Sequence, residues 1–435
     1  MSAGVRRTFA SLSIPNYRRY FSGQVVSITG NWMQTVAEMW LMVQLTGNGL
    51  SVGVTAALQF LPMLLFAPWG GLLADRVSKR RLLIVTQTLM AIPALTLWAL
   101  TMHGSVTVAM VYALVFARGA VNAVDNPARQ SFVMEMVGSD RVVNAVALNS
   151  VIVHSARIMG PAAAGVVIAL IGVSTCFLIN ALSFVAMIVA LRSMDSSQLH
   201  RSVTPADRGP GQLRQGLAYV RRTPELLIPL AMMAVVGTLS YNFQILLPLL
   251  ASFTWHGTAS TYTALVVAMG VGSVAGALAA GARGRVGPRL LVGAAALFGF
   301  AELLVAIAPE LPLQLLALIP LGAISVTFAA GVNSALQLAV EPTMRGRVMA
   351  LYSMVFLGST PIGAPLVGWI AEVWGPRGGL LLGAVAALVA AAGGAVAFAR
   401  AGRPVRLVTS RRDCERPRRR TAALREAVRV SVGRR

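Results

Sequence analysis

Ionisable and polar side chains interrupt several long apolar stretches of this sequence, and they are the groups that could do chemistry. Glu38 lies about midway along the first stretch. At about 100° per residue, Ser27, Asn31 and Gln34 fall on the same helical face as this carboxylate, which predicts a polar stripe. A carboxyl group in a half-dry cavity favours its neutral form, so Glu38 is a candidate for carrying a proton or meeting a cationic ligand.

Two further polar stripes have the spacing of one helical face. The first consists of Arg118, Asn122, Asp125 and Arg129. The second consists of Ser150, His154 and Arg157. Arg118 and Asp125 are too far apart to touch within one helix, so we expect each to find partners on other helices. The alternative is that these charges pair with one another, or with nearby carbonyl groups, and only fix helix packing.

The composition identifies the class of protein in which these stripes occur. Hydrophobic residues make up 56% of the 435 residues, charged residues 12%, and the mean hydropathy is +0.71. So few charges cannot cover a water-soluble surface, which indicates an integral membrane protein. An ionisable side chain at the centre of a membrane costs at least ~2.5–3.5 kcal/mol on insertion scales, so each one requires a reason.

Several chemistries are excluded by the residue types present. The only lysine, Lys79, does not end a glycine-rich loop, so the sequence has no P-loop for ATP hydrolysis. Cys176 and Cys414 provide neither a disulfide framework nor a metal cluster. There is no H-E-x-x-H motif or nucleophile elbow, so we expect no catalytic residue, no metal and no enzyme activity. Work on a solute would have to draw on a gradient, and we expect no cofactor.

Apolar stretches long enough to cross the ~30 Å of hydrocarbon as helices recur along the chain. We expect twelve of them, at 20–44, 50–74, 82–102, 105–127, 143–170, 172–192, 226–253, 258–282, 289–308, 312–338, 348–373 and 377–399. Among the loops between these helices, those after even-numbered helices carry nearly all the cations, and Arg377 is the only cation assigned to the loops after odd-numbered ones. The positive-inside rule therefore predicts a multi-pass protein of the cell membrane with both termini in the cytoplasm. A soluble helical bundle gives no reason for this asymmetry.

The loop between the sixth and seventh helices divides the chain into two halves. We expect an N-terminal half over residues 1–192, a cytoplasmic linker over 193–225, and a C-terminal half over 226–399. A shift of 203 residues places Gly160 on Gly363 and Gly165 on Gly368, which indicates an internal repeat. Repeated six-helix halves are the layout of transporters with a site at the midplane. Glu302, alone in its stretch, is expected to face the other half or to take up a proton.

Two basic segments are expected to lie outside the membrane. Residues 212–223 of the linker could form an amphipathic helix on the anionic cytoplasmic leaflet. The tail over residues 400–435 holds thirteen arginines against three carboxylates, and we expect it to be disordered. No aromatic residue is interleaved among these arginines for base stacking, so no nucleic-acid partner is expected.

Several motifs resemble one large family of membrane transporters. The segment from Gly71 to Arg81, which reads GLLADRVSKRR, resembles the G-x-x-x-D-R-x-G-R-R loop of the major facilitator superfamily, with Ser78 in place of the glycine. Arg157-Ile-Met-Gly160-Pro161, closing at Gly165, is similar to the fifth-helix glycine–proline motif of its proton-coupled exporters, with Ala164 in place of one glycine. Further matching stretches are Trp32–Gln34, Leu45–Gly47, Tyr219–Pro224 and Arg345–Val348. Together they resemble the enterobactin-exporter-like and multidrug-efflux branch.

This resemblance implies an all-α membrane fold of two six-helix pseudo-repeats. It further implies export of small amphiphilic molecules, such as drugs or siderophore-like compounds, by proton antiport with alternating access. An importer or facilitator of the same fold is the main alternative, and a non-transporting membrane assembly protein is another. The expected partners are a small-molecule substrate, protons and the lipid bilayer, and the chain is expected to act as a monomer.

The resemblance also assigns roles to the polar residues. Those expected to couple protons or contact substrate are Glu38, Asn31, Gln34, Arg118, Asn122, Asp125 and Arg157. Those expected to form the gate are Gly71, Asp75, Arg76, Lys79, Arg80, Arg81, Arg129, Gly160, Pro161 and Gly165. Asp75 should latch the cytoplasmic gate against a cation such as Arg129, or against the start of the eleventh helix. The stripes on the first and fourth helices should face a water-filled central cavity. Positive charge that merely holds the loop inside is the alternative for the basic segment, and helix packing is the alternative for the glycines.

Overall fold

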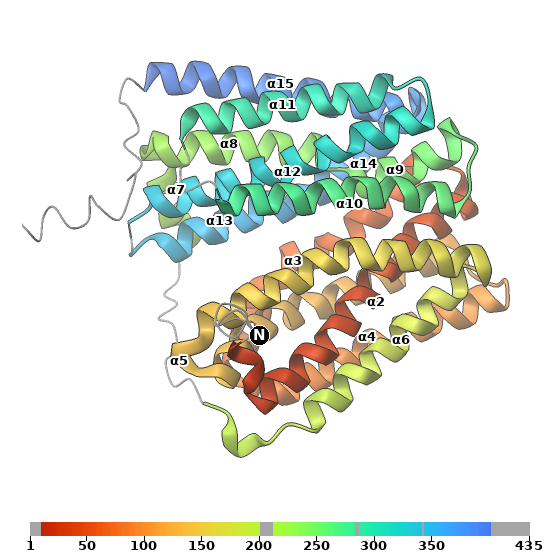
Figure 1. The fold of residues 1–435 in the computed structure, drawn as a ribbon, viewed down its shortest axis with the longest axis vertical. Helices are drawn as coiled ribbons and strands as arrows, with labels where there is room; N and C mark the ends of the chain where they lie inside the picture. The colour runs from red at the N-terminus through yellow and green to blue at the C-terminus, as the bar shows by residue number, and fades with distance from the viewer. Residues whose placement is uncertain (1–9, 201–211, 283–286, 342, 402–435) are drawn as a thin grey trace, which may run out of the picture.

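The computed structural model describes residues 10–200, 212–282, 287–341 and 343–401, and all regular elements in these ranges are helical. Figure 1 shows two groups of helices side by side. The first helix group consists of α2 (Pro15–Thr46), α3 (Gly49–Arg76), α4 (Lys79–Met102), α5 (Val108–Leu170) and α6 (Val173–Arg192), with the short helices η1 (Ala10–Ser13) and η2 (Ser196–Gln198). The second helix group consists of α7 (Gln212–Arg222), α8 (Pro224–Leu239), α9 (Phe243–Leu249), η3 (Leu250–Thr254), α10 (Ala259–Ala282), α11 (Pro288–Ile307), α12 (Leu311–Ala339), α13 (Arg345–Gly358), α14 (Thr360–Val373) and α15 (Gly375–Arg400).

The twelve expected membrane helices correspond to these elements. Eleven segments of the described chain are long and apolar enough to cross a membrane. The twelfth is α2, which is 32 residues long but carries the polar stripe. The all-α membrane fold expected from the sequence is confirmed. The half boundaries stay a prediction, and the linker residues 201–211 and the tail beyond Ala401 lie outside the described residues.

Four expected membrane helices are interrupted or joined in ways that the apolar pattern does not predict. The fourth and fifth are one continuous element, α5, with a kink at Gly138, whose φ of 68° is a left-handed conformation that favours glycine. The seventh is broken between Leu239 and Phe243, where the Ser240 hydroxyl donates to the Gly383 carbonyl of α15 at 2.7 Å. The eleventh is divided at Ser359 into α13 and α14.

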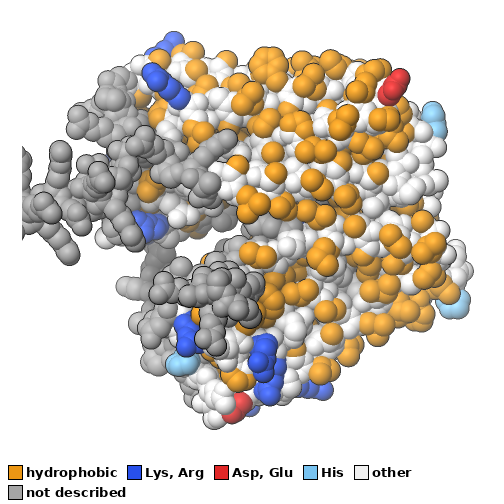
Figure 2. Space-filling model, viewed as in Figure 1, with side chains coloured by type: hydrophobic (Ala, Val, Ile, Leu, Met, Phe, Trp, Pro, Cys, Tyr) orange, Lys and Arg blue, Asp and Glu red, His pale blue; other side chains and the backbone are white. Residues whose placement is uncertain are grey.

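The two ends of the bundle differ. The linker end holds the start of α2, the helix α7 and the end of α15, whereas the hairpin end holds the short connections after α2, α4 and the kinked α5 (Figure 1). Lys and Arg side chains lie mainly toward the linker end, at the left of Figure 2, while hydrophobic side chains cover the flanks. The surface in Figure 2 is hollowed between the two helix groups at the linker end.

Close backbone contacts join the two helix groups at the hairpin end. A Cβ atom added at Gly49 of α3 would lie 2.5 Å from the Gly368 carbonyl oxygen of α14, so the two helices can meet only because this position has no side chain. Further along α3, Leu64 packs against Gly358, the last residue of α13. Beyond that point Gly70 packs against Ala123 within the first helix group instead. The contact therefore closes the hairpin end and leaves the groups apart toward the linker end.

Candidate transport site

A buried ion pair between α2 and α5 lies at the centre of the first helix group. Arg118 Nη2 donates to Glu38 Oε2 at 2.5 Å, and the two side chains are 7% and 0% exposed. The other carboxylate oxygen, Oε1, accepts a hydrogen bond from Gln34 Nε2 at 2.7 Å. Asn180 of α6 in turn donates to the Gln34 side-chain oxygen. Each carboxylate oxygen therefore has a donor, as a buried charge requires.

The direction of the polar stripe on α2 differs from the sequence expectation. We expected the stripe to face a water-filled cavity, but Ser27, Gln34 and Glu38 are all fully buried in this conformation. Their partners come from α4, α5 and α6, and Ser27 donates to Gln87 of α4 at 3.3 Å. Because these groups satisfy one another inside the first helix group, the stripe faces its interior. Asn31 is half-buried and donates to the Ser27 carbonyl one turn earlier.

A second buried pair lies toward the linker end of α5. Arg129 Nε donates to Asp125 Oδ2 one turn away on the same helix. Asp125 Oδ1 accepts hydrogen bonds from Thr86 at 2.6 Å and from Gln87 at 2.9 Å, both on α4. Asp125 thus has the expected partners on another helix, but its cation is on its own helix. Asn122, on the same face, is half-buried and makes no hydrogen bond with any described residue.

The expected latch joins Asp75 to a cation such as Arg129. Among the described residues, Arg129 forms its ion pair with Asp125, one turn away on the same helix. The side chains of Asp75, Ser150 and His154 lie outside the described residues. The gating role of Asp75 therefore stays a prediction.

The basic segment at the start of α4 makes contacts within the first helix group. Lys79 Nζ forms an ion pair with Glu135 of α5 at 2.6 Å. Arg80 donates to the carbonyl oxygens of Leu191 and Arg192, both at 2.7 Å. A cation at a helix C-terminus is favoured by the helix dipole, so Arg80 fastens α4 to the end of α6. Around them, Gly71 is half-buried, and Arg76 and Arg81 are exposed.

The glycine–proline motif of α5 lies where this helix meets α2 and α10. A Cβ atom added at Gly160 would lie 2.5 Å from the Trp32 Cβ atom, so this glycine lets α2 and α5 approach closely. Pro161 follows within the helix. One turn later, a Cβ atom at Gly165 would overlap Thr263 of α10, in the second helix group. The motif therefore serves both packing within the first helix group and contact between the two groups.

Arg157, one turn before Gly160, differs from the other two arginines of the stripes. Its side chain is exposed, and its guanidinium lies 5.2 Å from the centre of the Trp32 ring. It makes no hydrogen bond or ion pair with any described residue. The sequence placed it on a stripe but gave no indication of Trp32 as its neighbour.

One polar contact at the hairpin end was not expected from the sequence. Glu372 of α14 accepts hydrogen bonds from the Asn48 side chain at 2.9 Å and from the Leu50 amide at 3.3 Å. These groups form the start of α3, where an acidic side chain is favoured by the helix dipole. A signal was available, because Asn48 is a typical N-cap residue. The contact joins the two helix groups on the side that is closed.

Glu302 of α11 is buried against α15. Its side chain is 0% exposed, neither carboxyl oxygen has a hydrogen-bond partner, and it packs on Gly383. The expectation that it faces the other half is wrong, since α15 belongs to the same helix group.

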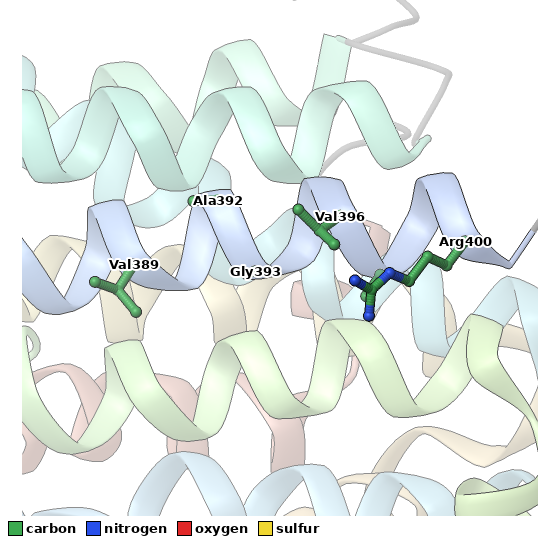
Figure 3. Close-up of a pocket in the computed structure, with 6 residues that line it drawn as sticks. Val389, Ala392, Gly393, Val396 and Arg400 are labelled. Carbon is green, nitrogen blue, oxygen red and sulfur yellow. The ribbon is translucent and has the colours of Figure 1, made fainter.

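None of the buried charged residues described above lines the surface groove along the last helix. It lies beside α15, as Figure 3 shows, and ends at Arg400. Its remaining lining is aliphatic or glycine: Val389, Ala392, Gly393, Val396 and Ala397. Because Val389 and Val396 are at least half exposed on the flank of the bundle, the groove is a lipid-facing surface rather than part of the transport site.

Comparisons with known proteins identify the family. The model of the family described as transmembrane secretion effectors matches residues 6–414. The staphyloferrin A transporter of Staphylococcus aureus is 26% identical over 59% of this chain and 64% of its own length. The macrolide efflux protein A of Streptococcus pyogenes is 23% identical over 81% of this chain and 88% of its own. The multidrug efflux pump Tap of Mycolicibacterium fortuitum is 26% identical over 80% of this chain and 87% of its own length. The chain thus spans less than two thirds of the first of these relatives.

Solved structures share the fold at low sequence identity. The nucleoside transporter NupG is 13% identical, with a TM-score of 0.73 over 88% of this chain and 99% of its own. A bacterial homologue of the iron transporter ferroportin, in an inward-facing state, is 12% identical to this chain. The TM-score is 0.69 over 89% of this chain and 99% of the homologue. On the family match over most of its length, the chain belongs to the transmembrane secretion effectors, a family of multi-pass membrane transporters of the major facilitator type.

Proposed function

We propose that this protein is a secondary active transporter that exports small amphiphilic molecules by proton antiport with alternating access. The observation that carries the proposal is the Glu38–Arg118 pair, because it is the one carboxylate–arginine pair of the described residues that joins two membrane helices. Among the relatives, the names of the macrolide and multidrug efflux pumps support export of amphiphiles.

The pair can convert protonation into movement. A proton on Glu38 removes the negative charge and leaves the Arg118 guanidinium buried without an anion. Breaking a buried ion pair by losing one partner costs ~3–5 kcal/mol, which is enough to change the balance between two conformations of a transporter. Because Gln34 and Asn180 continue the hydrogen bonding to α6, the packing of α2, α5 and α6 would respond to the proton.

The contacts between the helix groups supply the gate of this mechanism. The hairpin end is held by the α3–α14 glycine contact and by Glu372 on the start of α3. The linker end is hollowed between the groups (Figure 2). If the linker lies in the cytoplasm, as the positive-inside rule predicts, this conformation is open inward and ready to take up substrate for export.

Transport into everted membrane vesicles tests the proposal. The vesicles are loaded with acid buffer, so that the former outer face of the protein meets the higher proton concentration, and dyes, antibiotics and siderophores are added outside. We expect at least one amphiphile to accumulate inside, and an uncoupler to abolish the accumulation. Accumulation only in vesicles of the opposite orientation would support import instead, and accumulation that ignores the uncoupler would refute antiport.

A further inference from the structure

Arg157 is a cation at membrane depth that has no carboxylate partner among the described residues. It lies thirteen residues before the end of α5 at Leu170, which is about 20 Å along the helix. Each of the two other stripe arginines, Arg118 and Arg129, is bound to a carboxylate. Arg157 makes no ion pair or hydrogen bond with the described residues, although its side chain is exposed. A guanidinium at this depth with no anion among the described residues is costly, and an anionic group of a bound molecule would offset that cost.

The exposed guanidinium faces the space between the two helix groups rather than lipid. Arg157 is near enough to Tyr241, at the break between α8 and α9, for the two side chains to interact electrostatically. The next residue, Ile158, packs on Gly270 of α10, also in the second helix group. Both neighbours place this part of α5 at the junction of the groups, which is hollowed toward the linker end (Figure 2).

The Arg157 guanidinium lies over the ring of Trp32. The guanidinium carbon lies 5.2 Å from the centre of the Trp32 ring, within the range of a cation–π contact. Stacking on an aromatic face keeps the planar fork of an arginine oriented while its N–H donors stay free, and this fork matches the two oxygens of a carboxylate. The missing side chain at Gly160 is what allows Trp32 to reach α5.

An aromatic wall lies across from this cation. Tyr241 and Phe356 are half-buried, with ring centres 5.7 Å apart in an edge-to-face arrangement, and Phe356 stacks on Tyr352. The Tyr241 hydroxyl donates to the Ser325 carbonyl, so the ring is fixed in place. Such a wall accepts the apolar body of an amphiphile.

We propose that Arg157, stacked on Trp32, binds a carboxylate group of the transported molecule while the aromatic wall of Tyr241 and Phe356 contacts its apolar part. The substrate class is therefore an amphiphilic carboxylate. This inference rests on the proposed transport function and adds the charge of the substrate to it. The two contacts come from different helix groups, so the substrate would bridge them.

A matched pair of probes tests the charge requirement directly. Dansyl-leucine carries a carboxylate, and dansyl-leucine methyl ester is nearly the same molecule without the negative charge. Binding of each to the full-length protein in nanodiscs of uncharged lipid is followed by dansyl fluorescence. For the wild type we expect the carboxylate to bind at least about tenfold more tightly than the ester, which corresponds to about 1.4 kcal/mol.

Three variants assign this preference to Arg157. Arg157→Gln should bind both probes about equally, whereas Arg157→Lys should keep part of the preference, because it keeps the charge but not the fork. Arg377→Gln is the matched control, since Arg377 also lies over a tryptophan, Trp255, with 5.6 Å between the guanidinium and the ring centre, but at the hairpin end. The control should keep the full preference. Thermal unfolding of each variant verifies that the protein is folded.

The outcomes separate this inference from the proposed function. Equal binding of the two probes by the wild type, or an unchanged preference in Arg157→Gln, would overturn the carboxylate site and leave proton-driven export untouched. If Arg157→Gln does not fold, Trp32→Leu replaces it, and an undiminished preference in that variant counts equally against the site. Binding of neither probe by the wild type would overturn the inference as well.

Discussion

Replacing Glu38 by glutamine removes the negative charge of the buried pair at nearly constant volume. In the wild type, the two carboxylate oxygens accept hydrogen bonds from Gln34 at 2.7 Å and from Arg118 at 2.5 Å. The variant leaves the Arg118 guanidinium 7% exposed with no anion beside it, and its Nε already lacks a partner. Removal of one partner of a buried pair costs ~3–5 kcal/mol. Since the glutamine oxygen can still accept from Arg118, we expect Glu38→Gln to lose less than Glu38→Leu.

Stability and transport are measured together for this variant. Thermal unfolding of the purified protein should show a lower midpoint for Glu38→Gln. Glu38→Gln/Arg118→Gln should recover part of the loss, because no unpaired charge then remains at these two positions. Transport should lose accumulation driven by the proton gradient, and its pH dependence should flatten. Binding of a neutral substrate should be kept. The double variant is the control. If it regains stability but not proton-coupled transport, the role of Glu38 in stability is separated from its role in proton coupling.

One result would refute this reasoning. If Glu38→Gln still concentrates substrate against its gradient with an unchanged pH profile, Glu38 does not carry the proton. Asp125 and Glu302 would then be the remaining carboxyl groups well inside the described membrane helices, and the same pair of measurements would be applied to them.

Three further changes test the gate. Asp75→Asn should insert normally but cycle more slowly, and a wild-type transport rate per inserted molecule would refute its latch role. Glu372→Gln weakens the acceptor at the start of α3 by ~0.3–1 kcal/mol, so amide exchange of residues 49–54 should rise about two- to fivefold; unchanged exchange would count against this contact. Gly165→Ala should slow transport by overlapping Thr263, and Thr263→Gly should restore the rate in the double variant. A full rate in Gly165→Ala alone would contradict the close contact.

Much of the fold follows from the sequence because apolar stretches of membrane length must be helices. The breaks within those helices depend on tertiary contacts. The seventh expected helix stops at Leu239 and resumes at Phe243 while Ser240 binds a carbonyl group 143 residues away. No periodic pattern in the sequence predicts that contact. Gly138 similarly joins two expected helices into one element with a kink.

The positions of the charged site residues on their helices could be predicted from the sequence, but the residues with which they pair could not. The 100° spacing placed Glu38 and Arg118 on polar stripes, yet the rotation of each stripe depends on which neighbouring helix satisfies it. Arg118 lies 80 residues from Glu38, and Asn180 completes the network from a third helix. For the same reason the sequence left open whether Glu302 faces the other half or takes up a proton. Because Gly383 of α15 has no side chain, the Glu302 side chain instead packs there, buried within its own helix group.

Proton release on substrate binding tests the central claim that the Glu38–Arg118 pair exchanges a proton for substrate. Purified wild-type protein and Glu38→Gln are held in weakly buffered acidic solution with a pH indicator, so that Glu38 of the wild type starts with its proton. A substrate found in the vesicle screen is then added. The account predicts that the wild type releases protons in proportion to bound substrate and that Glu38→Gln binds without release. Equal release by the two proteins, or binding without release by the wild type, would contradict it.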